Sequence, residues 1–563
     1  MIMRILGVLG LVFIMALGVL GGEKKVVVGS TLDFLDYVFY DMPAGENVYP
    51  VSRLEQRIAE MKAGGIDRIY LRVNVCGLTL YPTKAGTLYG ELGGFHREKE
   101  LAKGAADLIR TVHAYDPLRE TIRLGHKYGL QVWAWESLWD DAARPIDPKG
   151  QPELAQYGAY PFMDPFFRQH PEGYSMRTGL TPAEIRAARQ QSVARIEITA
   201  DRKDRPQPRT TEKNLTIYTS NDNEHYTLYT GPRRVASARA ADGRWQLTIS
   251  DLKITSLFIK LTHQPQFPAD EEKYTIVLGG KYWRNCRVSN PAGKTIPVDW
   301  GCVVAPGKAG KDTPLEFGFP WSLSWDYADY QVGFVLGEDN SPAAKYFLGV
   351  CEFAVPAVKQ HKLAKFQELT AYDFDGFIFN LRSHSTNSDP GQYGYNPELL
   401  DLYRTRYGKE FRENPSTRAK LNDLRSDAID DFLAGCKALA GGRPLYFSGV
   451  ANDDNPSDNH MSAYAKQLGF QWHYAKWFRK GIVDGIIMIG NDFAPELKAA
   501  AAGKPIKIGK FREMAFPPKG SVFADDFKKM TANPDLDEVE LYETLVLTKD
   551  PRQFEIIRRY KEQ

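Results

Sequence analysis

The stretch YDFDGFIFNLRSHS, residues 372–385, decides the fold. Its middle, residues 376–381, is a continuous apolar and aromatic run of the length of one β-strand. Strands that are covered on both faces carry such runs, whereas half-exposed strands alternate apolar and polar residues. Three polar residues, Asn380, Arg382 and His384, stand at or beyond the end of this run. In a parallel barrel the chemistry lies where strands end, so we expect these three side chains on the working face.

Two aspartates, Asp373 and Asp375, precede the same run and therefore lie at the opposite end of the strand. Carboxylates at that end of a barrel strand are expected to have a structural role.

Similar strands occur on both sides of this stretch, and segments with helical periodicity separate them. Residues 51–64 form one amphipathic segment, and Asp116-Pro117 predicts a capped helix start. The predicted strands are residues 26–32, 66–74, 130–136, 376–381, 444–450, 483–489, 505–511 and 538–546. Eight strands alternating with helices predict an α/β fold, a (β/α)₈ TIM barrel.

The helical rhythm stops between about residue 189 and residue 310. Short alternating strands replace it, for example residues 194–198, 215–219, 245–249 and 257–261, with turn formers between them. This pattern predicts an all-β sandwich inserted between strands three and four. The expected organisation is therefore a signal peptide at 1–22, barrel at 23–188, sandwich at 189–310 and barrel again at 311–563.

Residues 214–229, together with 257–261, resemble a discoidin-like (coagulation factor 5/8 type C) module. The resemblance implies carbohydrate binding, and a purely structural insert is the alternative.

The N-terminus and the overall composition indicate an exported protein of ordinary charge. Residues 5–20 are apolar after Arg4, a run of about 16 residues, which is short for a membrane span and typical of a cleaved signal peptide. We therefore expect a secreted or periplasmic protein without a membrane span after cleavage. The net charge is +2, which gives no indication of a nucleic-acid partner. The five cysteines are scattered, which argues against a disulfide framework and against a thiolate metal site.

Several segments of the barrel together resemble bacterial family-10-like glycosyl hydrolases. They include Tyr115-Asp-Pro-Leu with the third strand, Phe167-Arg-Gln-His-Pro-Glu-Gly-Tyr, residues 355–363 leading into Tyr372-Asp-Phe-Asp-Gly-Phe, and Tyr403-Arg-Thr-Arg-Tyr-Gly. The resemblance implies a glycan substrate and no obligatory cofactor. One position departs from the family, because related fourth strands commonly end in an acid where this chain has Asn380.

Glycosidic cleavage usually needs two carboxyl groups, one as acid and one as nucleophile or base. The predicted catalytic residues are the strand-end acids Glu136, Glu513 and Glu543, and Glu540 is a further strand-end acid. Glu136 lies between two tryptophans, a setting that favours a proton donor, and an ion pair with a barrel residue is the alternative. The predicted substrate-binding residues are Asp33, Arg72, Trp135, Trp139, Asn380, Arg382, His384 and Asn491.

The leading functional hypothesis is therefore a secreted glycoside hydrolase that acts at the C-terminal rim of the barrel. A non-catalytic glycan-binding protein, favoured by Asn380, and a polysaccharide lyase that uses a His or Tyr base are the alternatives. No phosphate-binding loop, dinucleotide fingerprint or metal-binding spacing is evident, so we expect no cofactor and no metal.

Overall fold

The computed structural model describes most of the 563 residues. The described residues are 25–91, 99–141, 164–177, 182–200, 203, 207–208, 210–263, 283–302, 316–317, 330–337, 346–381, 393–452, 469–514 and 521–563. The expected signal peptide lies outside them, as do Arg382 and His384.

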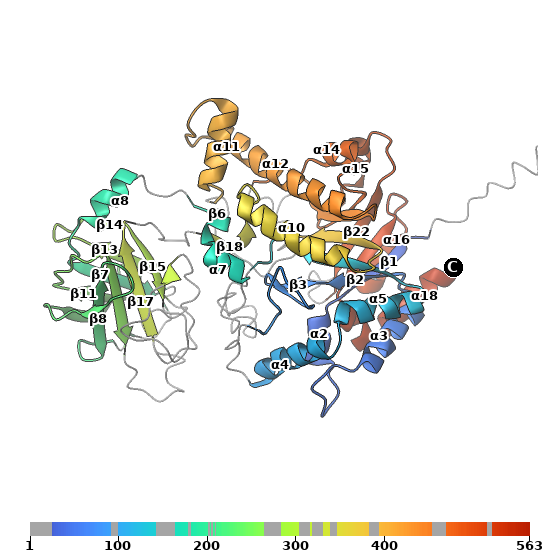
Figure 1. The fold of residues 1–563 in the computed structure, drawn as a ribbon, viewed down its shortest axis with the longest axis horizontal. Coiled ribbons are helices and arrows are strands. Elements are labelled where there is room, and N and C mark those ends of the chain that lie inside the picture. Colours follow the sequence, from blue (N-terminus) through green and yellow to red (C-terminus); the bar gives the residue numbers. More distant parts are fainter. Residues whose placement is uncertain are drawn as a thin grey trace, which may run out of the picture.

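Eight parallel strands close into a barrel in chain order, which confirms the predicted (β/α)₈ architecture (Figure 1). The barrel strands are β1 (Val27–Leu32), β2 (Arg68–Arg72), β5 (Gln131–Ser137), β19 (Gly376–Asn380), β20 (Leu445–Gly449), β21 (Gly485–Met488), β22 (Lys507–Glu513) and β23 (Glu538–Tyr542). The last strand closes on the first, with Gly29 opposite Glu540 and Ser30 opposite Leu541. Strand eight ends at Tyr542, earlier than predicted, because a helix, α17 (Thr544–Lys549), starts almost directly after it.

Helices connect successive barrel strands and cover the outside of the barrel (Figure 1). In chain order they are α2 (Phe34–Tyr40), α3 (Val51–Ala63), α4 (Lys99–Ala114), α5 (Pro117–Lys127), α10 (Pro356–Thr370), α11 (Pro397–Tyr407), α12 (Pro415–Leu439), α14 (Tyr474–Lys480), α15 (Ala494–Ala501), α16 (Phe523–Thr531), α17 and α18 (Pro551–Glu562). The predicted start of α5 is confirmed, because the Asp116 carboxylate accepts the N–H groups of Leu118 and Arg119.

The inside of the barrel is filled by large side chains that face glycines. A Cβ at Gly29 would lie 2.6 Å from the Tyr70 ring, and one at Gly376 would lie 2.7 Å from Trp133. Since real Cβ contacts are not this short, only glycine leaves room for these aromatic rings. The barrel interior is therefore a packed core rather than a channel.

The bottom of the barrel repeats one hydrogen-bonding pattern four times. An aspartate directly precedes the second, fourth, sixth and eighth strands of the barrel, which are β2, β19, β21 and β23. Its Oδ2 accepts the N–H of a residue at the start of the barrel strand before it. The four pairs are Asp67 with Val28, Asp375 with Val132, Asp484 with Leu445 and Asp537 with Ile508. In each pair the aspartate N–H also donates to the carbonyl of the same residue. The structural role predicted for Asp375 is consistent with this pattern.

Two antiparallel sheets lie in the chain between β5 and β19, and their strands gather at one end of the molecule in Figure 1. The five-stranded sheet comprises β7 (Arg195–Ala200), β10 (Arg234–Arg239), β11 (Trp245–Ser250), β13 (Trp283–Ser289) and β14 (Thr295–Ile296). The six-stranded sheet comprises β8 (Leu215–Ser220), β9 (Thr227–Leu228), β12 (Phe258–His263), β15 (Val298–Cys302), β16 (Glu316–Phe317) and β17 (Tyr330–Leu336).

Buried residues from both sheets form one apolar cluster, separate from the cluster of the barrel. Ile198 and Ile249 come from the smaller sheet, and Ile217, Ile259 and Phe334 come from the larger one. The larger sheet extends to residue 336, past the expected boundary at 310, because β17 pairs with both β12 and β15.

Several smaller elements lie outside the barrel strands and the two antiparallel sheets. A hairpin of β3 (Asn74–Val75) and β4 (Leu78–Thr79) follows β2, and β6 (Tyr174–Met176) pairs with β18 (Tyr346–Cys351). The remaining short helices are α7 (Pro165–Gln169), the 3-10 turn η1 (Pro171–Gly173) and α8 (Pro182–Arg189).

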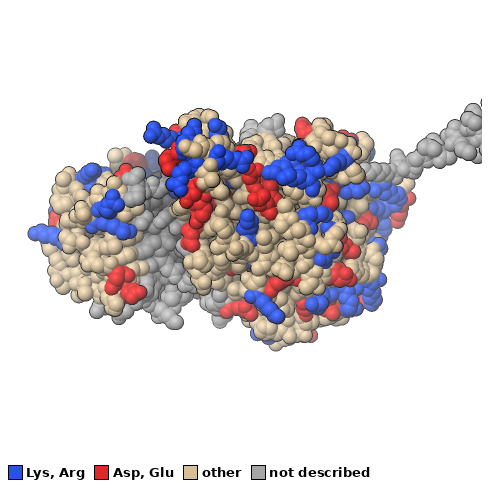
Figure 2. All heavy atoms as spheres, turned by 45° about the horizontal axis from the view of Figure 1, so that its top comes forward, with Lys and Arg blue, Asp and Glu red and all other residues tan. Residues whose placement is uncertain are grey.

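The surface carries charges of both signs. On the face drawn in Figure 2, Lys and Arg side chains are interspersed with Asp and Glu. Within the described part of the chain, no helix is both long enough and apolar enough to span a membrane.

Candidate active site

Three carboxyl groups meet at the C-terminal rim, where the last barrel strand closes on the first. Asp33 follows β1, Asp36 lies in the first turn of α2, and Glu543 follows β23. Each offers an oxygen within 4.8 Å of the other two. The closure of the barrel therefore brings residues from both ends of the chain into one site.

A buried arginine holds one side of this site in place. The Arg72 guanidinium, 3% exposed, lies 2.8 Å from Asp33 Oδ2 and 3.0 Å from Asp140 Oδ2. Its Nε donates to the Asn74 carbonyl, and Nη1 lies 3.4 Å from the hydroxyl of Tyr542. Because Arg72 binds two carboxylates at once, it fixes the position of Asp33 beneath the rim.

The electrostatics of the cluster keep a proton in the site. Burial and the neighbouring carboxyl groups of Asp33 and Glu543 raise the pKa of Asp36 well above its usual value. Burial also raises the pKa of Asp33, although Arg72 opposes this shift. Since adjacent carboxyl groups do not all ionise readily, Asp36 keeps its proton to a higher pH than an exposed aspartate does.

Glu136, which the sequence predicts as a catalytic acid, does not join this cluster. Alternate residues of a strand face opposite sides, and the neighbouring Trp135 faces the barrel interior, where its indole bonds Glu540. Glu136 therefore faces the helix layer. There, burial raises its pKa, while the charges of Lys362 and Lys365 on α10 oppose this shift. Among the described residues Glu136 forms no ion pair, so the predicted ion-pair alternative stays a prediction.

The other predicted acids and amides take different positions. Glu513 is the last residue of β22, is partly exposed and pairs in register with Tyr542, so it lies on the rim. Asn380, a predicted substrate-binding residue, is fully buried, and its amide donates to Ser448 Oγ at 2.9 Å. Its side chain is therefore not at the surface, where a sugar could contact it. Asn491 is exposed after β21, and its carbonyl accepts from Lys510.

Both predicted aromatic residues are buried and packed against other side chains. Trp135 is 0% exposed, and Trp139 packs against Phe470 and Trp472 with ring centroids 4.7 and 6.0 Å apart. In the described structure neither of these predicted substrate-binding residues has an open ring face for stacking on a sugar, because other side chains cover both indoles.

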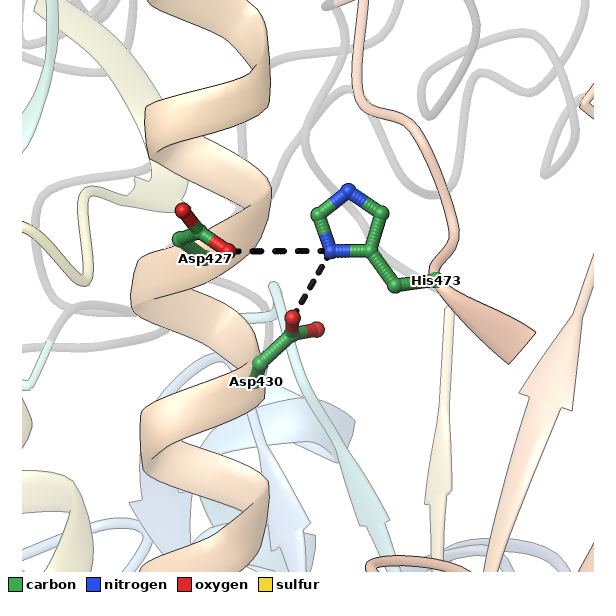
Figure 3. A group of neighbouring side chains, drawn as sticks. All are labelled: Asp427, Asp430 and His473. Atoms are coloured by element: carbon green, nitrogen blue, oxygen red, sulfur yellow. Dashed lines mark hydrogen bonds and ion pairs between the residues drawn. The ribbon is translucent and has the colours of Figure 1, made fainter. Parts of the chain in front are cut away.

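A second group of side chains with metal-ligand chemistry lies away from the rim, between α12 and the start of α14 (Figure 3). His473 Nδ1 lies 2.7 Å from Asp430 and 3.9 Å from Asp427. The ammonium group of Lys476 lies 2.6 Å from each of the same two carboxylates. A protein cation thus already neutralises these carboxylates, and the group acts as an ionic clamp between two helices.

Two residues of the rim network, Asp36 and Asp140, are not among the site residues that the sequence predicts. Asp36 stands three residues after Asp33, which is one turn of a helix. A helix that begins at Asp33 therefore places both carboxyl groups on one side. The three-residue spacing of Asp33 and Asp36 is visible in the sequence, but it has this meaning only because α2 begins directly after Asp33.

No family model and no curated protein matches the sequence. Solved structures that are similar include the catalytic domain of a beta-amylase from Paenibacillus polymyxa, with 8% identity, coverage of 93% of this chain and 94% of that one, and a TM-score of 0.35. A beta-galactosidase from Marinomonas ef1 has 9% identity, coverage of 92% and 54%, and a TM-score of 0.34. An alpha-glucosyl transfer enzyme has 9% identity, coverage of 92% and 67%, and a TM-score of 0.26. With such TM-scores, these likenesses support neither an activity nor a substrate for this chain.

Proposed function

We propose that this protein is a secreted glycoside hydrolase of the family-10-like kind, with Asp36 and Glu543 as its catalytic carboxyl pair. The observation that carries the proposal is the meeting of three carboxyl groups at the barrel rim, where Asp33, Asp36 and Glu543 have oxygens within 4.8 Å of one another. Glycoside hydrolysis requires one protonated and one ionised carboxyl group across the scissile bond. Asp36 supplies the proton to the leaving oxygen, and Glu543 acts as nucleophile or base.

The short distance between the carboxyl groups suggests the stereochemical outcome. Retaining enzymes hold their two carboxyl groups about 5–5.5 Å apart, whereas inverting enzymes leave about 6.5–9.5 Å for a water molecule. Asp36 and Glu543 have oxygens within 4.8 Å of each other, which is closer than the inverting spacing. We therefore expect the product to keep the anomeric configuration of the substrate, which proton NMR of the first product detects.

The two antiparallel sheets complete the proposal as an inserted sandwich of discoidin type that binds carbohydrate. Their shared apolar cluster and the sequence resemblance support this assignment. Deleting residues 189–337 is expected to weaken binding to an insoluble glycan while small soluble substrates are still hydrolysed.

The experiment that tests the activity is a glycan panel with reducing-end and unsaturated-product readouts. On the substrate that it identifies, Glu543→Gln and Asp36→Asn should each reduce turnover by at least ~100-fold, the usual scale for acid–base catalysis. Glu136→Gln is the matched control, since Glu136 faces the helix layer, and it should retain turnover. Binding without product would leave a glycan-binding protein, and unsaturated product would indicate a lyase.

A further inference from the structure

Glu540 is a buried carboxyl group to which the proposed hydrolysis gives no role. It lies in the barrel interior, two residues before Tyr542, with 0% exposure. Its Oε1 accepts hydrogen bonds from the Trp135 indole N–H at 2.8 Å and from the Thr31 hydroxyl at 3.1 Å. Its Oε2 is also buried and has no hydrogen-bond partner among the described residues. Leaving a buried carboxyl oxygen unpaired is costly, particularly if it is charged.

Trp135 connects this carboxyl group to the rim. Its ring lies 5.5 Å from Arg72 Cζ, and its centroid lies 5.9 Å from that of Tyr542. Arg72 is the residue that binds Asp33, at 2.8 Å. The Arg72 guanidinium thus lies over the Trp135 ring, and Glu540 fixes the position of this ring by accepting the indole N–H.

We propose that Glu540 is a positioning residue that fixes Trp135 beneath Arg72 and so sets Arg72 against Asp33. The inference rests on the proposed function, because the site that it positions is the one assigned there. In the layer around Glu540, Thr31 of β1 and Trp135 of β5 donate hydrogen bonds. Glu538 of the same strand and Arg68 of β2 are the neighbouring charges.

The protonation state of Glu540 controls how it holds the indole. Burial raises the pKa of Glu540 to about 8, although the hydrogen bonds from Trp135 and Thr31 oppose this shift. The group is therefore mostly neutral at pH 7. Loss of its proton places a negative charge directly on the acceptor of the Trp135 N–H, which changes the electronic environment of the indole.

Fluorine NMR of the full-length protein, labelled with 5-fluorotryptophan, tests this inference without a substrate. Trp135→Phe, or Trp135→Tyr if the first variant does not fold, assigns the resonance. We expect the Trp135 resonance to shift between pH 6 and pH 10 with a midpoint near the pKa of about 8, and this transition to vanish in Glu540→Gln. Trp133, an inward indole of the same strand, is the matched control, and its resonance should not depend on Glu540.

Two results would overturn the proposal: a Trp135 resonance that stays constant over this pH range in the wild-type protein, or one that still titrates in Glu540→Gln. If a substrate is known, Glu540→Gln should keep kcat within about threefold, since the amide keeps the acceptor. Glu540→Leu should lower kcat at least tenfold, with KM nearly unchanged. Equal effects of both variants on kcat would also contradict it. Failure of the hydrolase assignment would leave the NMR transition intact, so the two failures are distinguishable.

Discussion

Asp36 holds its proton more tightly in the folded protein than in the unfolded chain, and this difference has a cost in stability. A carboxyl group whose pKa is raised by folding stabilises the fold fully below its unfolded value of about 3.8, and this contribution is lost as the pH rises through the folded pKa. Asp36→Asn removes the titration. We therefore predict that Asp36→Asn melts higher than the wild type at pH 8, by about 2 °C for ~1 kcal/mol, and that the gain disappears near pH 4.

Asp41, which directly follows α2, is a control of opposite sign. Hydrogen bonds from Arg57 and Arg53 lower the pKa of Asp41 in spite of its partial burial. Its contribution is therefore present above the unfolded value of 3.8 and lost as the pH falls through the folded pKa. Asp41→Asn should destabilise the protein at pH 8, and the loss should shrink toward acid pH. If the difference in Tm between Asp36→Asn and the wild type is the same at every pH from 4 to 8, the assignment of the proton to Asp36 is contradicted.

At the scale of the element, the clamp between α12 and α14 makes a second pH-dependent contribution (Figure 3). The hydrogen bond to Asp430 raises the pKa of His473, and partial burial opposes this shift. The stabilisation is thus complete below the unfolded value of 6.5 and lost as the pH rises through the folded pKa. We predict that His473→Gln lowers the free energy of unfolding by about 1 kcal/mol at pH 6 and by much less at pH 9.

Urea denaturation at the two pH values measures this difference. His113→Gln, which changes an exposed histidine in the last turn of α4, should have no comparable effect. A loss that is equal at pH 6 and pH 9 would show that His473 acts through packing alone.

The elements of the barrel were predictable from the sequence because buried parallel strands carry long apolar runs. The side that a given residue faces was less predictable. From the sequence, either Trp135 or Glu136 could point into a site at the rim. The hydrogen bond from Trp135 to Glu540 places Trp135 inside the barrel, and the adjacent residue Glu136 therefore faces outward. The boundary at 310 was also too early, since β17 has the same alternating pattern as the strands before it. The Asp33–Glu543 contact required closure of the barrel, which no local pattern encodes.

At the scale of the whole molecule, the four aspartates at the bottom of the barrel connect its strands in pairs by hydrogen bonds. The pairs are β1 with β2, β5 with β19, β20 with β21, and β22 with β23. In the sequence each aspartate follows an apolar residue and directly precedes a strand, as in Ile66-Asp67 and Phe374-Asp375. The barrel is thus built from four similar units, and each unit is closed by one side chain. Since these bonds lie opposite the carboxyl site, they support the fold and not the chemistry.

Asp375 offers the sharpest test of this role, because a neighbouring aspartate provides a matched control. Asp375 Oδ2 accepts the Val132 N–H at 2.7 Å, whereas the Asp373 side chain is 94% exposed. Asp375→Ala leaves that N–H without its acceptor and should cost about 1–2 kcal/mol, comparable to the loss of a helix cap. Asp375→Asn keeps an acceptor oxygen and should cost less, and Asp373→Ala should change stability by no more than about 0.5 kcal/mol. Urea denaturation followed by tryptophan fluorescence measures all three, because Trp133 and Trp135 lie inside the barrel. Equal midpoints for Asp375→Ala and Asp373→Ala would show that the strand pairs hold without these side chains.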